Sequence, residues 1–167
     1  MALALPQRIR SIPRDDLLGA IVAIVLVNLV GASGVVFTNP NSEWFQSLTL
    51  PWFYPPPALF GIVWTLLFSL LGVAVYLVYR SPAGRSRSVA LVAFGVQMAF
   101  NVAWSPAFFA AESPTLGLAV IIPLFGLILA TIVAFDRVNR RAAGLLVPYL
   151  LWVGFATVLN GTIYLLN

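Results

Sequence analysis

Residues 114–135 read PTLGLAVIIPLFGLILATIVAF, an unbroken run without a charged side chain. At about 1.5 Å per helical residue, this run is long enough to cross the roughly 30 Å of hydrocarbon in a bilayer. Four more uncharged apolar runs of similar length occupy residues 17–37, 58–79, 89–111 and 144–166. Strands of a membrane β-barrel would be about half as long and would alternate in polarity. The sequence therefore predicts an all-α integral membrane protein, a bundle of five transmembrane helices.

The composition agrees with this class and limits the chemistry. Of the 167 residues, 61% are hydrophobic and only 8% are charged, against about a quarter in soluble domains. The spans use most of the chain, so we expect one membrane domain over residues 1–167. Cysteine, histidine and lysine are absent, which excludes disulfides, a Ser-His-Asp triad, histidine- or thiolate-bound metal and a lysine Schiff base. We expect no metal site and no obligatory cofactor.

The arginines indicate how the chain is oriented. Cytoplasmic loops of membrane proteins retain basic residues, and translocated loops do not. All the basic residues fall before the first span, after the second or after the fourth: Arg8, Arg10, Arg14, Arg80, Arg85, Arg87, Arg137, Arg140 and Arg141. The opposite side carries Glu43 and Glu112. We therefore expect a cytoplasmic N-terminus with Asn167 on the far side, and we attribute the basic pI to orientation, without a nucleic-acid partner.

The first apolar run also imitates a signal peptide. Arginines precede it, and the small residues Gly31, Ala32 and Ser33 could form a cleavage site. The apolar run nevertheless continues to Phe37 and reaches full spanning length, which a signal peptide does not need. We expect a retained transmembrane helix.

Polar residues inside the spans are neutral. The acidic residues lie at or beyond span ends, so no carboxylate is placed for a proton or cation relay in mid-membrane. Ion-coupled pumping is therefore not expected. The neutral polar residues are Asn28, Gln97, Asn101, Ser105, Thr131, Thr157 and Asn160. Taken singly, each is interpreted as a hydrogen-bonding group between helices.

The third span has two contrasting faces. At about 100° per residue, Gln97, Asn101, Trp104 and Phe108 fall in one stripe, which we expect to face the bundle interior. The opposite stripe consists of small residues that let another helix approach closely: Gly95, Ala99 and Ala103. This ridge is compatible with a homodimer interface and equally with packing inside one chain.

Two other spans carry tryptophan in a similar stripe. The second aligns Phe60 and Trp64, and the fifth aligns Trp152, Phe155 and Leu159. Aromatic walls with a few amides suit a large, flat, mostly apolar ligand, because rings stack on rings and the indole N–H still donates a hydrogen bond. A packed aromatic core has the same sequence pattern, so the pattern alone leaves both interpretations open.

These residues occur in motifs that resemble those of the TspO/MBR or translocator protein family. The motifs are Phe60-Gly61-Ile62-Val63-Trp64 in the second span, Asn101-Val102-Ala103-Trp104-Ser105-Pro106 in the third, and Pro148-Tyr149-Leu150-Leu151-Trp152 with Phe155 to Asn160 in the fifth. Three such motifs in order on a five-span chain make the resemblance specific, and it covers nearly the whole chain.

The resemblance implies a five-helix bundle, usually dimeric, with a pocket that opens toward the long loop after the first span. The ligands it implies are porphyrins such as protoporphyrin IX or haem, and the membrane it implies is the cytoplasmic membrane of a prokaryote. The residues that match the family's pocket are Trp64, Asn101, Trp104, Phe108, Trp152, Ala156 and Leu159; the stripes add Phe60 and Phe155. Trp64 and Trp152 also match tryptophans linked to light- and oxygen-dependent porphyrin degradation.

The sequence departs from the family at one end. The family's sterol motif needs a basic residue after an aromatic one, but here Tyr164 is followed by Leu165, Leu166 and Asn167. A sterol role at this end is therefore not expected. Three functions are carried forward: a porphyrin receptor or sensor, a photo-oxidative porphyrin-degrading activity, and an uncoupled carrier of porphyrin or lipid.

Overall fold

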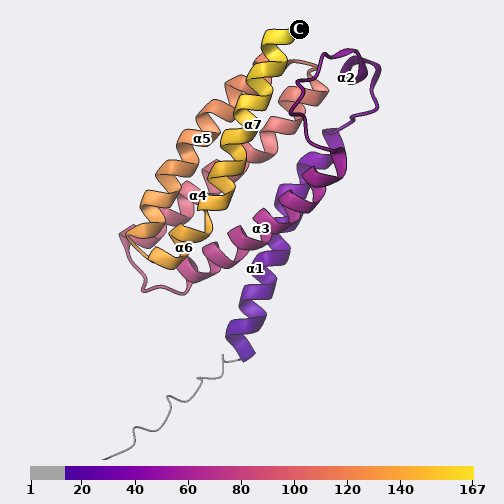
Figure 1. Cartoon of the computed structure of the whole chain (residues 1–167). Coiled ribbons are helices and arrows are strands. Elements are labelled where there is room, and N and C mark those ends of the chain that lie inside the picture. Colours follow the sequence, from indigo (N-terminus) through magenta and orange to yellow (C-terminus); the bar gives the residue numbers. More distant parts are fainter. Residues whose placement is uncertain (1–13) are drawn as a thin grey trace, which may run out of the picture.

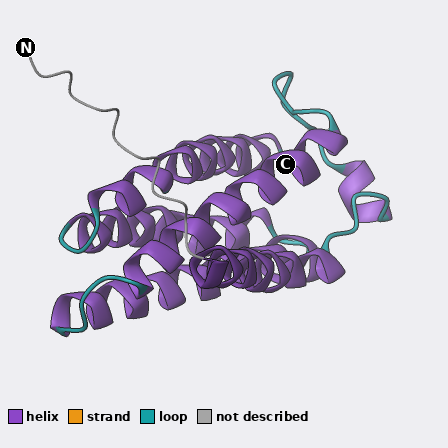
Figure 2. Cartoon of the chain, turned by 90° about the horizontal axis from the view of Figure 1, so that it is seen from below, coloured by secondary structure: helices purple, strands orange, loops and turns teal. Residues whose placement is uncertain are grey.

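The structure, a computed structural model, describes residues 14–167, and the regular elements in this range are all helical (Figure 2). Five helical segments are long and apolar enough to span a membrane, which confirms the predicted fold class. They are built from α1 (Arg14–Ala32), α3 (Pro57–Tyr79), α4 (Arg85–Ser105), α5 (Pro114–Asp136) and α7 (Val147–Leu166). Shorter elements complete the chain: η1 (Ser33–Phe37), α2 (Glu43–Ser47), η2 (Pro106–Ala110) and α6 (Arg140–Leu145).

The starts of α3 and α5 lie where proline predicts them. Pro57 and Pro114 occupy the first turn of their helices, where a missing N–H is not needed by the helix. Ser113 caps α5, because its hydroxyl oxygen accepts a hydrogen bond from the Leu116 N–H at 3.2 Å. These two spans agree with the predicted ranges to within one residue at each end.

The other three spans change geometry near one end. The first tightens into the 3₁₀ helix η1, and the third widens into the π-helical turn η2. Pro106 has no N–H to continue the α-helical pattern, and its carbonyl instead accepts from the Ala111 N–H at 2.9 Å. The fifth span is divided at Leu146 into α6 and α7, just before Pro148. The predicted spans 17–37, 89–111 and 144–166 thus each contain two helical elements.

The five spans form two packing groups. In Figure 1, α1 and α3 lie together on one side, and α4, α5 and α7 lie together on the other. We call these the α1–α3 pair and the three-helix group. Helices α1 and α3 approach closely at Gly72, where an added Cβ would lie 2.5 Å from the Ile24 Cα. A larger residue at Gly72 would force these backbones apart.

The two ends of the bundle differ in charge. The long loop of residues 38–56, which contains α2 and which we call the lid, lies at the same end as Asn167 (Figure 1). The described arginines from Arg80 onward cluster at the opposite end, where Arg80 forms a 2.7 Å ion pair with Asp16. Arg8 and Arg10 lie outside the described residues. The charge asymmetry on which the predicted orientation rests is therefore present in the fold, and the orientation itself stays a prediction.

Candidate ligand-binding site

A cavity of about 370 Å³ lies between the α1–α3 pair, the three-helix group and the lid. We call it the main cavity. Its lining is mostly aromatic and aliphatic, with amides and hydroxyls as the polar groups. The lining residues are Asn28, Gly31, Ala32, Val35, Thr38, Pro40, Phe45, Tyr54, Pro57, Phe60, Gly61, Trp64, Thr65, Phe68, Asn101, Trp104, Ser105, Phe108, Phe109, Ala156, Leu159, Asn160 and Ile163. None of them carries a formal charge at neutral pH.

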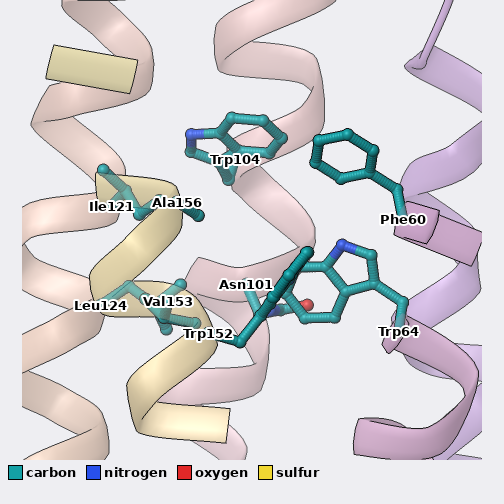
Figure 3. Close-up of a pocket in the computed structure, with 9 residues that line it drawn as sticks. All are labelled: Phe60, Trp64, Asn101, Trp104, Ile121, Leu124, Trp152, Val153 and Ala156. Atoms are coloured by element: carbon teal, nitrogen blue, oxygen red, sulfur yellow. The ribbon is translucent and has the colours of Figure 1, made fainter. Parts of the chain in front are cut away.

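A smaller space of about 40 Å³ adjoins the main cavity, and we call it the inner chamber. Figure 3 shows Phe60 and Trp64 projecting from α3 toward residues of α4, α5 and α7. The two spaces share Phe60, Trp64, Asn101, Trp104 and Ala156, and the inner chamber adds Ile121, Leu124, Trp152 and Val153. The shared residues form the boundary between a broad outer space and a narrow inner one.

Two tryptophans of the main cavity are held by stacked phenylalanines. Trp64 stacks on Phe68 with ring centroids 5.1 Å apart, and its edge meets Tyr149 at 6.2 Å. Trp104 stacks on Phe108 at 5.2 Å. Because offset stacking restricts ring rotation, both indoles are fixed in place as walls of the site.

A hydrogen-bond chain fixes Trp104 more firmly. Its indole N–H donates to the Asn160 side-chain oxygen at 3.1 Å, and the Asn160 amide donates to the Pro114 carbonyl at 2.9 Å. Gly117 leaves room for this chain, since an added Cβ would lie 2.6 Å from the Asn160 oxygen. Helices α4, α5 and α7 are therefore joined by polar groups beside the cavity.

A second polar cluster lies under the cavity floor. The Tyr149 hydroxyl donates to the Gln97 side-chain oxygen at 2.9 Å and accepts from the Asn101 amide at 3.0 Å. Both Gln97 and Tyr149 are fully buried. Among the described residues, the Gln97 amide nitrogen and the Trp152 indole nitrogen are buried without a partner. Asn101 is thus positioned from below by Tyr149, a residue that the stripes did not select.

The neutral polar residues of the spans follow their predicted role in part. Gln97, Asn101 and Asn160 bond between helices, which confirms the prediction for them. Thr131 and Thr157 instead donate to carbonyls four residues earlier in their own helices, at 2.7 Å each. A threonine hydroxyl reaches that carbonyl without any neighbouring helix, so the prediction was wrong for these two.

The lid closes one end of the main cavity with aromatic side chains. Phe45 is buried and lies 5.4 Å from Phe109 and 6.3 Å from Tyr54, measured between ring centroids. Burial raises the pKa of the Tyr54 phenol above its ordinary value, further from physiological pH, where a phenol is already neutral. The lid is also tied to α7, because the Thr49 N–H donates to the Asn167 side-chain oxygen at 2.9 Å.

The structure brings most of the predicted pocket residues together. Phe60, Trp64, Asn101, Trp104, Phe108, Ala156 and Leu159 line the main cavity. Trp152 lines only the inner chamber. Phe155 lines neither space and packs against Trp152 and the lid residue Phe53, at centroid distances of 5.4 and 6.3 Å.

Sequence reasoning missed the contributions of α1 and the lid. Phe45 and Tyr54 come from the lid, and Asn28 and Gly31 come from α1. The lid had a usable signal, because its aromatic residues lie close together in a loop rich in proline. Helix α1 offered one polar residue, Asn28, but its apolar residues surround the helix on all sides and give no inward stripe.

The ridge of small residues faces away from the bundle. Gly95, Ala99 and Ala103 are exposed on α4, and an added Cβ at Gly95 would meet nothing within 4 Å. Packing inside one chain, one of the two interpretations of the ridge, is therefore excluded for these residues.

Known proteins resemble this chain over most of its length. The profile of the TspO/MBR family matches residues 22–166. The tryptophan-rich protein TspO of Chlorobaculum tepidum is 42% identical over 140 residues, which cover 83% of this chain and 89% of the relative. The protein of the same name from Archaeoglobus fulgidus is 36% identical over 91% of this chain and 99% of its own. The human translocator protein is 38% identical over 71% of each chain. With five spans, the expected motifs and these relatives, the chain belongs to the TspO/MBR family of membrane proteins.

Proposed function

We propose that this protein is a membrane receptor or sensor that binds porphyrins in the main cavity. The observation that carries the proposal is the position of Trp64 and Trp104, two fixed indoles that line an uncharged cavity of about 370 Å³. Sites for small organic ligands typically occupy about 300–1,000 Å³ and combine apolar walls with a few polar groups. The relative from Cereibacter sphaeroides, named tryptophan-rich sensory protein, agrees with a sensor role.

The lining favours a flat aromatic ring over a charged or flexible ligand. Indole and phenyl faces gain dispersion energy from a ring system, and Asn101 and Asn160 add polar groups at fixed positions. No histidine or cysteine exists in the sequence to ligate haem iron in the usual way. Binding would therefore depend on the ring, and metal-free and iron porphyrins should bind with similar affinity.

The direct test is a titration of the purified protein with protoporphyrin IX, followed by quenching of tryptophan fluorescence. The proposal expects saturable binding that is weakened by Trp64→Ala. The matched control is Trp52→Ala, because Trp52 is 95% exposed and does not line the cavity. Quenching that never saturates, or that is equal in wild type and Trp64→Ala, would reject the site.

A second candidate is oxidative breakdown of bound porphyrin in light, with molecular oxygen as the oxidant. It is favoured by Trp64 and Trp152, which both line the inner chamber and would supply electrons to a photoexcited ring. Irradiation of the complex distinguishes the two functions. Loss of the porphyrin spectrum that slows in Trp152→Phe at equal occupancy would favour degradation, because phenylalanine is harder to oxidise than indole.

Transport is the third candidate, and the cavity lining contains no charged residue to couple it to an ion. Uptake of protoporphyrin IX into protein-containing vesicles, compared with protein-free vesicles, tests it.

The assembly we propose is a homodimer formed through Gly95, Ala99 and Ala103, because this exposed ridge lets two helices approach closely.

A further inference from the structure

The main cavity reaches the side of the bundle between α1 and α3. Ala32 and Val35 at the lid end of the first span line the cavity and are also exposed on the outer surface. Gly61 and Thr65 on α3 have the same two properties. We call these four residues the side window. The cavity is thus bounded by small or short side chains where it meets the surroundings of the protein.

The packing around α3 differs between its middle and its lid end. At Gly72 the two backbones are in contact, since an added Cβ would lie 2.5 Å from the Ile24 Cα. At Gly61, about three turns closer to the lid, an added Cβ would meet nothing within 4 Å. The α3 backbone is therefore tightly packed against α1 at Gly72 and uncovered at Gly61.

The surroundings of the window are apolar. The exposed fractions of Val35, Ile62 and Leu66 are 65%, 67% and 60%, and all three lie on membrane spans. Gly61 and Thr65 lie four and eight residues after Pro57, or about 6 and 12 Å along the helix axis. The window therefore begins a short way into the lid-end leaflet, where acyl chains and not water would cover it.

The two carboxylates of a porphyrin limit how it can pass through this opening. Protoporphyrin IX carries two carboxylates, and an unpaired carboxylate in a low-dielectric space is very costly. No described residue of the cavity lining is basic, and the described arginines cluster at the opposite end of the bundle. The carboxylates must therefore stay in water or among lipid headgroups while the ring is bound.

From these observations we infer that the ligand enters the main cavity sideways, from the lid-end leaflet through the side window, and not from water through the lid. This inference rests on the proposed function and names the route and orientation of the ligand. A porphyrin dissolved in a leaflet keeps its carboxylates at the headgroups and its ring among the acyl chains. It can slide between α1 and α3 at that depth without carrying its charges into the hydrocarbon.

The test places larger side chains in the window and measures rates. Gly61→Leu and Ala32→Leu narrow the opening from its two sides, and Gly126→Leu and Ala130→Leu are matched controls on the exposed face of α5. Proteoliposomes are mixed with protoporphyrin IX, and binding and release are followed by tryptophan quenching. We expect both window variants to slow association and dissociation, by roughly tenfold each, because an obstructed path is crossed in both directions. Both residues also line the cavity, so Kd is measured separately by titration, and faster dissociation would indicate a damaged site and not an obstructed path. The controls should keep wild-type rates.

A further variant separates the routes. Asn167→Ala removes the hydrogen bonds that hold the lid at Thr49, so faster association in this variant would indicate entry through the lid and would overturn the inference. Wild-type rates in both window variants would also overturn the route while leaving the receptor proposal intact. Absence of saturable binding in the wild type would reject the proposed function itself.

Discussion

Trp104 on α4 donates its indole N–H to the side-chain oxygen of Asn160 on α7, 3.1 Å away and 56 positions later in the chain. The same asparagine donates to the Pro114 carbonyl at the start of α5. The three-helix group is therefore joined at one point beside the cavity, and the orientation of the Trp104 ring depends on it. The stability of the bundle and the shape of the site are linked through this asparagine.

Replacing Asn160 with Ala should destabilise the protein by about 1–2 kcal/mol, because the Trp104 N–H and the Pro114 carbonyl each lose a hydrogen bond to Asn160 in a partly buried place. Unfolding in mixed detergent measures the change. The control is Thr162→Val, since the Thr162 hydroxyl only donates to the Val158 carbonyl of its own helix. Equal stability of the two variants would show that the Asn160 bonds contribute nothing net.

Removing the Trp64 indole should weaken protoporphyrin binding by roughly tenfold to a hundredfold, or about 1–3 kcal/mol of lost stacking and apolar contact. Trp64→Phe should cost less, because it keeps much of the apolar area. Asn101→Ala should also be milder than Trp64→Ala if stacking dominates. A larger loss in Asn101→Ala, measured by fluorescence titration, would mean that hydrogen bonding determines affinity.

Replacing Ala99 with Leu should break the proposed homodimer, because a branched side chain on the exposed ridge separates the two helices. Porphyrin affinity should stay nearly constant, since Ala99 does not line the cavity. Light scattering of the detergent-solubilised protein measures the assembly, with Ala130→Leu as a control on an exposed face of α5. A variant that stays dimeric would place the interface elsewhere.

The predicted orientation can be tested by labelling single introduced cysteines, because the sequence has none of its own. Ala83→Cys lies in the exposed loop between α3 and α4, and Asn41→Cys lies in the exposed part of the lid. In intact cells, an impermeant maleimide should label Asn41→Cys and spare Ala83→Cys. The reverse labelling pattern would invert the topology.

Affinity for the uncharged dimethyl ester of protoporphyrin should be constant between about pH 6 and 9. Tyr54 is the lone titratable group among the cavity-lining residues, and burial raises the pKa of its phenol, so it stays neutral through this range. A raised phenol pKa lowers stability only as the pH rises past the ordinary value of about 10, where the unfolded chain loses the proton first. Titrations at several pH values test this, and a step near neutrality would indicate a titrating group elsewhere.

The spans and the inward faces of α3 and α4 could be predicted because each depends on local periodicity. Gln97, Asn101 and Phe108 are buried as their common stripe required, and Gly95, Ala99 and Ala103 lie opposite. Periodicity gives the direction of a side chain around its helix and nothing about the distance to the next helix. Phe155 and Trp152 illustrate this limit, because both point inward but packing places only Trp152 beside the inner chamber.

The remaining features arise from contacts between segments far apart in the chain. Tyr149 positions Asn101 across two helices, and Phe45 reaches the cavity because the lid folds over it. The side window depends on residues of α1 and α3 that line the cavity together. Such distances follow from tertiary packing, which no stretch of sequence encodes by itself.

The separation of the spans into the α1–α3 pair and the three-helix group has a mechanical consequence. The main cavity lies between these two groups, so a ring bound there would contact both of them and connect them. Ligand binding would then restrain the two groups relative to each other near the cavity, and hydrogen exchange at the facing sides of α3 and α4 would slow together. A protein built this way can report occupancy through its rigidity, without any helix moving to a new position.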